Sequence, residues 1–422
     1  MHSPFDQIRS ADAPASYWQA TSSAHMRRVA ALPARTNVVV VGGGLLGVAT
    51  SYWLARSGVA TVLIEQGDLA SGATGRNGGF MGAGTAERYS AALTRLGHAT
   101  AHAVWQITLD NRALLRQVLG EEAINCDYRE PGHIHLALGD VQLAELAADV
   151  AALRADGFVA DLLDRRALQE LIATPLGPTI SGGIFAPEDG LLHSARLIHG
   201  LAAAAERHGA VLATGTALTS LAPDGNGVLA RTTGGDLRAD AAVIAANAWL
   251  DQIVPALAGR VTPVRGQALA FAPAPTIFAH GMGAALTPTG EYWQQTPDGT
   301  IILGGCRAVA SSQDVGIRDS RPTPEVQAAL EQVLPSLFPA LTGLRVTRRW
   351  AGPMAFTADY LPIADRAPEL PNTWMVGGFC GHGMPFGMRL GQLLAQAAVD
   401  GIPPAALKPF RLDRPTLPRT ED

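Results

Sequence analysis

The stretch Val38-Val39-Val40-Val41-Gly42-Gly43-Gly44-Leu45-Leu46-Gly47 decides the fold. Four consecutive β-branched residues are typical of a strand that is covered on both faces of a parallel sheet. The glycines that follow form the pattern G-x-G-x-x-G, and residues 45–57 have the apolar spacing of a helix. A second strand is expected over residues 60–64. The segment is therefore a βαβ unit of the dinucleotide-binding type.

Each glycine of the pattern has a physical role. Gly42 permits the tight turn, Gly44 lets the backbone approach a pyrophosphate, and Gly47 allows close packing of helix on strand. Free N–H groups at the start of the helix stabilise phosphate charge. Glu65 ends the second strand, where a carboxylate binds the adenosine ribose and repels the 2′-phosphate of NADP. These residues predict a dinucleotide site and leave FAD and NAD as alternatives.

Composition limits the class of protein. The chain has 422 residues, of which 47% are hydrophobic and 16% charged, and its formal net charge is −5. This length favours two domains. No basic block and no apolar segment of bilayer length is present, so we expect neither nucleic-acid binding nor membrane insertion, and the cytoplasm by default. The widely spaced Cys126, Cys306 and Cys380 predict neither a disulfide framework nor a metal site.

The rest of the chain alternates predicted helices and strands. Residues 1–35 contain three prolines and are expected to form an extended arm. Tyr292-Trp293-Gln294-Gln295, a Pro297-Asp298-Gly299 turn and Ile301-Ile302-Leu303 predict a hairpin and hence an antiparallel sheet. Further helices are expected over 99–119, 142–155, 196–208 and 384–399, with Pro385 in the first turn of the last one, and further strands over 133–137, 209–212, 217–221, 241–245 and 374–378.

Four further motifs resemble those of the D-amino acid oxidase-like family of FAD oxidoreductases, and above all its γ-glutamylputrescine oxidoreductase branch. They occur in the family's order along almost the whole chain. They are Ser16-Tyr17-Trp18, Ser71-Gly72-Ala73-Thr74-Gly75-Arg76-Asn77-Gly78-Gly79, Ala245-Ala246-Asn247-Ala248 and Gly378-Phe379-Cys380-Gly381-His382-Gly383.

The resemblance implies an α/β fold in which an FAD-binding Rossmann-like domain of the glutathione reductase type is interleaved with an antiparallel-sheet substrate domain. The predicted segments are an N-terminal arm (1–35), the FAD-binding domain (36–115, 191–260 and 351–422) and the substrate domain (116–190 and 261–350). The residues expected to bind FAD are Gly42, Gly44, Leu45, Leu46, Gly47, Glu65, Gln66, Ser71, Thr74, Gly75, Arg76, Asn77, Gly78, Gly79, Ala217, Leu218, Ala246, Asn247, Trp249, Gly352, Gly381, His382, Gly383 and Met384.

Candidate substrate-side residues also follow from the resemblance. Tyr292, Trp293, Arg307 and Arg349 are expected on the sheet above the flavin, where an arginine would anchor a carboxylate and an aromatic ring would stack on an alkyl amine. Arg76 is expected to face phosphate or a substrate anion. His382 lies in the loop that, in the family, meets the pyrimidine end of the flavin and stabilises negative charge on the reduced ring.

These expectations favour an enzyme that oxidises the C–N bond of a small amine or amino acid to an imine, with oxygen or another acceptor reoxidising FAD. The segment 351–357 lacks the cysteine that tethers flavin in sarcosine oxidases, which predicts non-covalent FAD. Ile302 stands where those enzymes carry a lysine that promotes reaction with oxygen, so oxidase and dehydrogenase remain alternatives. Two further alternatives are C–O oxidation of a 2-hydroxy acid or glycerol phosphate and a non-catalytic flavin-binding protein. A monomer or small homo-oligomer is expected.

Overall fold

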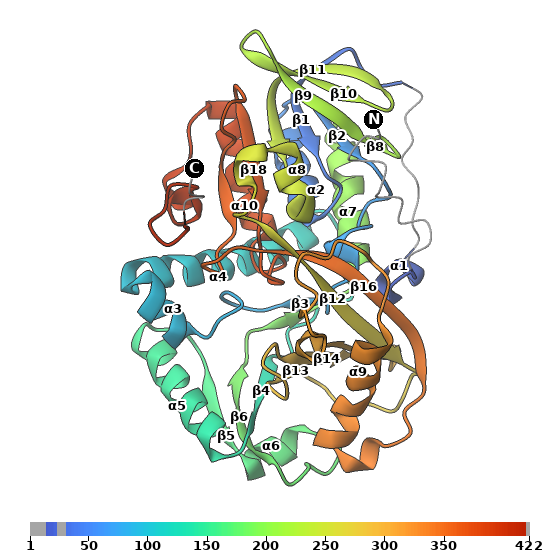
Figure 1. Ribbon diagram of the computed structural model, residues 1–422, viewed down its shortest axis with the longest axis vertical. Helices are drawn as coiled ribbons and strands as arrows, with labels where there is room; N and C mark the ends of the chain where they lie inside the picture. Colours follow the sequence, from blue (N-terminus) through green and yellow to red (C-terminus); the bar gives the residue numbers. More distant parts are fainter. Residues whose placement is uncertain (1–13, 23–30, 419–422) are drawn as a thin grey trace.

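A computed structural model of the chain describes residues 14–22 and 31–418. It contains two eight-stranded sheets, one in each half of the molecule (Figure 1). The two sheets are interleaved along the chain: β1, β2, β8 to β11, β17 and β18 form the first sheet, and β4 to β6 and β12 to β16 form the second. The short strands β3 and β7 pair with each other in a separate two-stranded sheet. The predicted fold class is confirmed, and the exact domain boundaries stay a prediction.

The first sheet is built around the strand that opens the glycine pattern. Its parallel core has the order β18-β11-β1-β2-β8. Val39 and Val40 of β1 are fully buried between β11 and β2, as expected for a strand covered on both faces. The strands are β1 (Arg35–Val41), β2 (Thr61–Glu65), β8 (Val211–Thr214), β9 (Leu218–Asp224), β10 (Gly227–Thr232), β11 (Gly235–Ile244), β17 (Ile363–Arg366) and β18 (Thr373–Gly377).

Helices cover the first sheet and cross to the second. The principal ones are α2 (Leu45–Arg56), α4 (His98–Glu121), α7 (Ser194–Arg207) and α10 (Gly387–Asp400), with α4 running between the two halves (Figure 1). α2 and α10 pack side by side and in parallel, because Gly387 lies against Leu45 and Gly391 against Ala49. The first turns of these two helices therefore lie next to each other.

The second sheet has the order β16-β12-β15-β14-β13-β4-β6-β5 and contains the predicted hairpin as β14 and β15. One face packs on α9 (Pro324–Leu337) through Leu269, Trp293 and Leu303. We call the opposite one the inner face. The strands are β4 (His133–Leu138), β5 (Asp161–Asp164), β6 (Ile180–Ala186), β12 (Thr262–Phe271), β13 (Gly281–Ala284), β14 (Glu291–Gln295), β15 (Ile301–Gly305) and β16 (Val346–Phe356).

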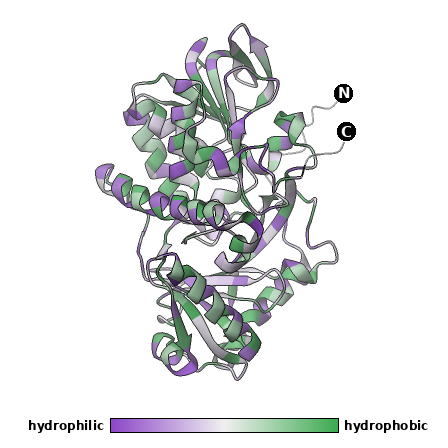
Figure 2. Cartoon of the chain, turned by 90° about the vertical axis from the view of Figure 1, so that its left-hand side faces the viewer, coloured by the Kyte–Doolittle hydropathy of each residue, from purple (hydrophilic) through white to green (hydrophobic). Residues whose placement is uncertain are grey.

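Further elements complete the described chain. Hydrophobic and hydrophilic residues alternate along its outer helices (Figure 2), and within residues 14–22 and 31–418 no helix is both long and apolar enough to cross a bilayer. The elements are α1 (Tyr17–Ala20), β3 (Phe80–Met81), α3 (Tyr89–Leu96), α5 (Asp140–Ala155), α6 (Arg165–Leu171), β7 (Gly190–Leu191), α8 (Leu250–Ile253) and 3-10 helices of three to six residues such as η3 (Asn247–Trp249) and η5 (Arg307–Val309).

Two local predictions were wrong. The described part of the arm is not extended, because Ser16 and Gln19 form a capping box that begins α1, and Trp18 is buried. The other residues of the arm before position 14 and over 23–30 lie outside the described residues. The last helix begins at Gly387, so Pro385 stands in the turn before it and not in its first turn.

Candidate cofactor and substrate site

The N-terminus of α2 leaves room and donors for a diphosphate. The helix has no side-chain cap and no acidic residue in its first turn. A Cβ placed on Gly44 would approach only the hydroxyl of Thr74, at 3.1 Å, and that hydroxyl accepts a hydrogen bond from the Leu45 amide at 3.1 Å. Free amides at a helix start with an open approach form an anion site. The residues present therefore fit the diphosphate of a dinucleotide.

Glu65 stands at the end of β2 next to this helix start. Its two carboxylate oxygens accept hydrogen bonds from the amides of Gly43 at 2.6 Å and Gly67 at 2.7 Å. Burial raises the pKa of Glu65, and these two amides oppose that shift. The amide of Thr216 bonds the Glu65 carbonyl at 2.8 Å, which brings the predicted residues 217–218 beside the same strand end. Each carboxylate oxygen retains a lone pair for a ribose hydroxyl.

The Arg76 side chain donates hydrogen bonds to three backbone carbonyls. Its Nε donates to the carbonyl of Ser71, and Nη1 donates to those of Pro14 and Ala351, each at 3.0 Å. A Cβ placed on Gly352 would stand 2.7 Å from the Arg76 side chain, so this glycine makes room for it. The guanidinium thus links the N-terminal arm, the loop that contains Ser71, and β16. This is a structural role that the sequence reading missed, and the contact of Arg76 with an anion stays a prediction.

The next residues of the motif connect the arm to the second sheet. The carbonyl of Asn77 accepts a hydrogen bond from Trp18 Nε1 at 2.6 Å, and its side-chain oxygen accepts one from the Gly79 amide at 2.9 Å. Gln294 of β14 donates to the carbonyl of Gly78 at 2.5 Å. Residues 77–79 are therefore held rigidly along the inner face of the second sheet.

The third segment that resembles the family, residues 245–248, follows β11, which pairs with β1 on the side opposite to β2. A Cβ on Gly42 would stand 2.6 Å from the carbonyl of Ala245, which explains why the turn after β1 needs glycine. Asn247 has φ of 44°, and its side-chain oxygen accepts a hydrogen bond from the Gly378 amide at 3.2 Å. This bond joins η3 to the loop before α10. Contacts of Ala246, Asn247 and Trp249 with FAD stay predictions.

The loop before α10 is positioned by a residue that the sequence reading missed. Asn111 of α4 is fully buried, and its side-chain oxygen accepts hydrogen bonds from the amides of Met388 at 2.8 Å and Arg389 at 3.0 Å. Its side-chain amide donates to the Met384 carbonyl at 3.3 Å. Asn111 thereby caps α10 and fixes the end of the loop that contains His382, whose side chain is exposed.

The inner face of the second sheet lies opposite the motif loop. Tyr292 points to this face, and a Cβ on Gly78 would stand 2.7 Å from its ring. Phe80 contacts both Tyr292 and His133 edge to face, with ring centroids 5.8 and 5.5 Å apart. Trp293, the next residue along β14, is buried on the opposite face. Of this aromatic pair, only Tyr292 is placed to contact a substrate.

The two candidate arginines, Arg307 and Arg349, lie in different environments. Arg307 is half-buried, stands over the Phe356 ring at 5.0 Å and donates to the Gln313 carbonyl at 3.5 Å. Burial lowers its pKa. In contrast, Arg349 pairs in register with Leu269, on the face that packs on α9, and forms an ion pair with Glu331 at 2.7 Å. This position contradicts the prediction that Arg349 anchors a substrate, because the sheet lies between Arg349 and Tyr292. Its ion pair with Glu331 indicates a structural role.

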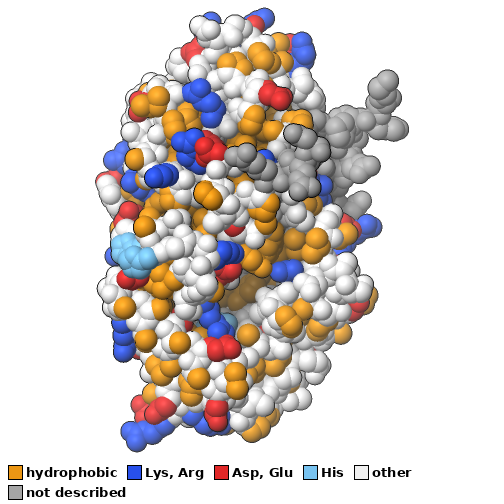
Figure 3. Space-filling view, turned by 60° about the vertical axis from the view of Figure 1, so that its left-hand side comes forward, with side chains coloured by type: hydrophobic (Ala, Val, Ile, Leu, Met, Phe, Trp, Pro, Cys, Tyr) orange, Lys and Arg blue, Asp and Glu red, His pale blue; other side chains and the backbone are white. Residues whose placement is uncertain are grey.

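His133 and His135 on β4 are further inner-face residues missing from the predicted site. The alternating sequence His133-Ile134-His135-Leu136 was a usable signal, because alternate residues of a strand share one face. Ile134 and Leu136 pack in the core on the α9 side, so the two imidazoles face inward. Figure 3 shows a hollow in the molecular surface, with hydrophobic side chains at its bottom and both positively and negatively charged ones at its margin.

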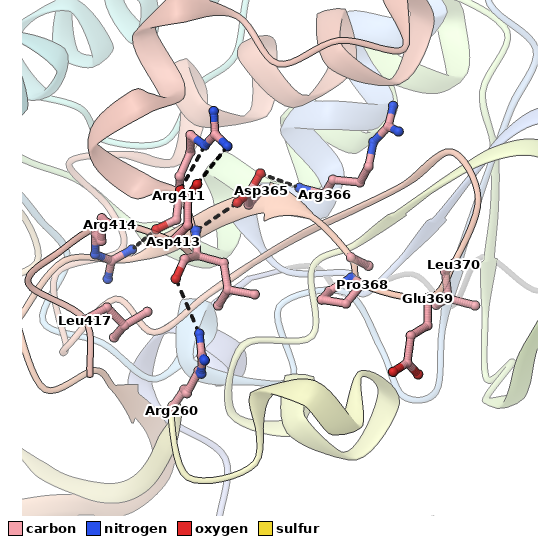
Figure 4. A pocket seen from close by; sticks show the side chains of 12 residues that line it. Arg260, Asp365, Arg366, Pro368, Glu369, Leu370, Arg411, Asp413, Arg414 and Leu417 are labelled. Carbon is pink, nitrogen blue, oxygen red and sulfur yellow. Dashed lines mark hydrogen bonds and ion pairs between the residues drawn. The ribbon is translucent and has the colours of Figure 1, made fainter. Parts of the chain in front are cut away.

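A separate pocket of about 640 Å³ lies beside β17 and the C-terminal segment (Figure 4). Several of its polar side chains already have partners: Arg411 pairs with Asp413, and Asp365 accepts a hydrogen bond from the Leu412 amide at 2.8 Å. Arg260 donates to the Leu412 carbonyl at 3.3 Å. None of the predicted site residues lines this pocket, and we assign it no ligand.

Comparison with known proteins agrees with this geometry. The chain is 26% identical to γ-glutamylputrescine oxidoreductase of Escherichia coli over 372 residues, covering 85% of this chain and 83% of that protein, and 26% identical to the probable oxidoreductase OrdL of Rhizobium meliloti over 377 residues, covering 86% and 83%. Its fold matches the crystal structure of glycine oxidase from Geobacillus kaustophilus with a TM-score of 0.78 and 24% identity, over 90% of this chain and 99% of that one. The family model DAO, FAD dependent oxidoreductase, matches residues 37–397. The chain belongs to this family of FAD-dependent oxidoreductases.

Proposed function

We propose that the protein oxidises the C–N bond of a small amine or amino acid. The observation that carries the proposal is the position of the inner face: Tyr292 and its neighbours stand beside residues 77–79, which continue from the dinucleotide cradle. FAD, when bound, supplies the two-electron acceptor. The relatives γ-glutamylputrescine oxidoreductase and glycine oxidase are named for amine or amino-acid substrates, which supports the C–N assignment.

The side chains of the inner face suit a neutral amine. Burial raises the pKa of Tyr292 to about 12, so its hydroxyl remains protonated and donates a hydrogen bond. Hydride removal from a neutral amine needs orientation of the substrate and no strong base, and the protonated Tyr292 hydroxyl can supply part of that orientation.

Arg307 is our candidate for binding a substrate anion. Within residues 14–22 and 31–418, no carboxylate lies within ion-pair distance of its guanidinium, and its hydrogen bond to the Gln313 carbonyl is long. A half-buried guanidinium that has no carboxylate partner gains from a carboxylate ligand. The flavin is expected to be non-covalent, because the cysteines of the described chain are buried and Cys306 points to the α9 side.

Anaerobic mixing of the flavin-loaded protein with an amine panel tests the proposal. The panel contains secondary amines, N-substituted glycines, D-amino acids and γ-glutamyl polyamines, and at least one member should bleach the flavin absorbance. Release of an imine or of ammonia distinguishes C–N oxidation from C–O oxidation, which yields a keto acid alone. If no member of the panel reduces the flavin, the C–N assignment is wrong.

A further inference from the structure

Met354 of β16 lies on the inner face of the second sheet. Alternate residues of a strand share a face, and Trp350, Gly352 and Met354 alternate with residues that lie on the α9 side. Trp350 Nε1 donates a hydrogen bond to the Arg76 carbonyl at 2.9 Å, and Gly352 lies against the Arg76 side chain. This row of residues therefore follows the loop that is predicted to bind FAD.

The thioether of Met354 also reaches the loop before α10. A Cβ placed on Gly381 would stand 3.4 Å from its sulfur, and one placed on Gly266 of β12 would stand 3.2 Å from the same atom. The sulfur thus lies between the sheet and the residues 381–384, which are likewise predicted to bind FAD. A small oxidant formed at a flavin held by these two segments would form close to this sulfur.

Exposure distinguishes Met354 from the other methionines. Within residues 14–22 and 31–418, Met354 is half-buried and every other methionine is buried. A dissolved oxidant must reach the sulfur atom before it can react, so an accessible thioether is oxidised ahead of buried ones. The buried methionines are Met81, Met282, Met375, Met384 and Met388.

The cysteine thiols are poor competitors for an oxidant. Cys126, Cys306 and Cys380 are all buried, and burial raises the pKa of each thiol. The thiolate is the form that reacts readily with peroxides, so a buried and protonated thiol reacts slowly. Among the sulfur atoms of the described residues, the Met354 thioether is therefore the most accessible to oxidation.

We propose that Met354 is a modification site, at which hydrogen peroxide converts the thioether to a sulfoxide and thereby slows the enzyme. The O–O bond of the peroxide breaks, one oxygen atom bonds to sulfur, and the other leaves as water with both protons. Sulfur loses two electrons and the peroxide gains them. The inference rests on the proposed function, which yields hydrogen peroxide whenever oxygen is the electron acceptor. The sulfoxide is polar where the thioether was apolar, so it disturbs a substrate held between the sheet and the loop.

Peptide mass mapping tests the reactivity of Met354 without any substrate. The flavin-loaded protein is treated with graded hydrogen peroxide, and Met354 should gain one oxygen atom at lower doses than the buried methionines and the cysteines. Met1 and Met26 lie outside the described residues and are mapped separately. If a buried methionine or a cysteine is oxidised ahead of Met354, the proposal is overturned.

Variants test whether this oxidation slows the enzyme. Anaerobic flavin reduction by an amine of the panel is timed before and after peroxide, and each variant is compared with its own untreated rate. The wild-type rate should fall about tenfold or more, because a small displacement of the substrate is costly at the reacting centre. Met354→Leu has a similar volume and cannot form a sulfoxide, so its rate should persist. Met375→Leu, buried on β18, is the matched control and should be slowed like the wild type.

A second variant reproduces the modified state. Met354→Gln places a polar oxygen at a similar distance along the side chain, so its limiting rate should be low without any peroxide. FAD content and melting temperature separate a slowed enzyme from one that has lost its cofactor or its fold. If Met354→Leu does not fold, the mapping and Met354→Gln decide. If Met354→Leu is slowed as strongly as the wild type, or if Met354→Gln turns over at the wild-type rate, the proposal is overturned while C–N oxidation stands.

Turnover under oxygen identifies the source of the peroxide. Sulfoxide that forms at Met354 despite added catalase arises from peroxide made in the site, whereas sulfoxide that catalase prevents arises from peroxide in solution. If no amine of the panel reduces the flavin, the proposed function fails, and the mapping with added peroxide still decides whether Met354 is the reactive site.

Discussion

Gly391 of α10 lies against Ala49 of α2 so closely that a Cβ placed on the glycine would stand 2.7 Å from the Cβ of Ala49. The contact lets two helices run side by side from their first residues, Leu45 and Gly387. Their positive ends consequently lie together at the predicted cofactor site. The glycine pattern beside β1 creates one of these ends, and the packing glycines of α10 bring the other to it.

Gly391→Ala should therefore weaken both the protein and its hold on FAD. The added methyl group must push α10 from α2, and overpacking of this kind costs about 1–3 kcal/mol. We expect a lower melting temperature and a larger dissociation constant for FAD, measured by thermal unfolding and by fluorescence titration of apoprotein. Gly120→Ala is the control, because Gly120 is in α4 with open space around it and should be neutral or stabilising. Equal behaviour of the two variants would contradict the packing argument.

Arg76→Lys tests whether the guanidinium is structural. Lysine cannot reproduce the fork that bonds the carbonyls of Ser71, Pro14 and Ala351, so one or more of these acceptors, of which that of Ala351 is buried, lose a partner. The expected cost is about 1–3 kcal/mol per unsatisfied group, visible as a lower melting temperature of the apoprotein. The exposed Arg348→Lys is the control. A variant with unchanged apoprotein stability and weaker FAD binding would instead make Arg76 a cofactor ligand.

Arg307 and Arg349 should respond differently to truncation, because the second sheet lies between them. Arg307→Ala is expected to raise KM for carboxylate-bearing substrates at least about tenfold, since a charged hydrogen bond of about 1.5–3 kcal/mol is lost. Arg349→Ala should leave KM unchanged and lower stability only slightly, because its ion pair with Glu331 is half-exposed. Steady-state kinetics on any carboxylate substrate found in the amine panel separates the two. An effect of Arg349→Ala as large as that of Arg307→Ala would contradict the assigned faces.

The contrast between these arginines shows where sequence reasoning ends. The glycine pattern and Val38–Val41 predict the first sheet because their signals are local. Arg348 and Arg349 are consecutive polar residues on β16, so no alternation tells which one faces the site. Only the pairing of Leu269 with Arg349 settles the face. Tertiary register, which depends on strands far apart in the chain, carries that information.

The two wrong local predictions, the start of α10 and the extended arm, have different causes. The start of α10 depends on Asn111, which is 277 residues earlier in the chain and therefore invisible to a local reading. In contrast, Ser16-x-x-Gln19 is a capping-box pattern that the sequence contains, and the flanking prolines obscured it. Like the capping box, the inner-face position of His133 and His135 could have been predicted from the sequence, because they alternate with apolar residues along β4. Their chemistry was not considered.

His193 predicts how stability depends on pH. It caps α7, with Nδ1 accepting a hydrogen bond from the Arg196 amide at 3.2 Å, while Nε2 lies 2.9 Å from the Thr21 hydroxyl, which itself donates to Tyr17. Nε2 therefore carries the proton and Nδ1 must stay bare. Burial, reinforced by the Arg196 cation, lowers the pKa of His193 to about 4. Protonation would place a second proton against the Arg196 amide and break the cap.

The folded-state pKa of His193 lies below its unfolded value of about 6.5, so the unfolded chain binds the extra proton between these limits. The contribution to stability is complete above pH about 6.5 and is lost as the pH falls towards 4, with a slope of up to about 1.4 kcal/mol per pH unit. His193→Asn keeps a capping acceptor and cannot titrate, so urea unfolding at several pH values should show a shallower acid loss than the wild type. An unchanged slope in His193→Asn would show that this cap does not depend on a neutral imidazole.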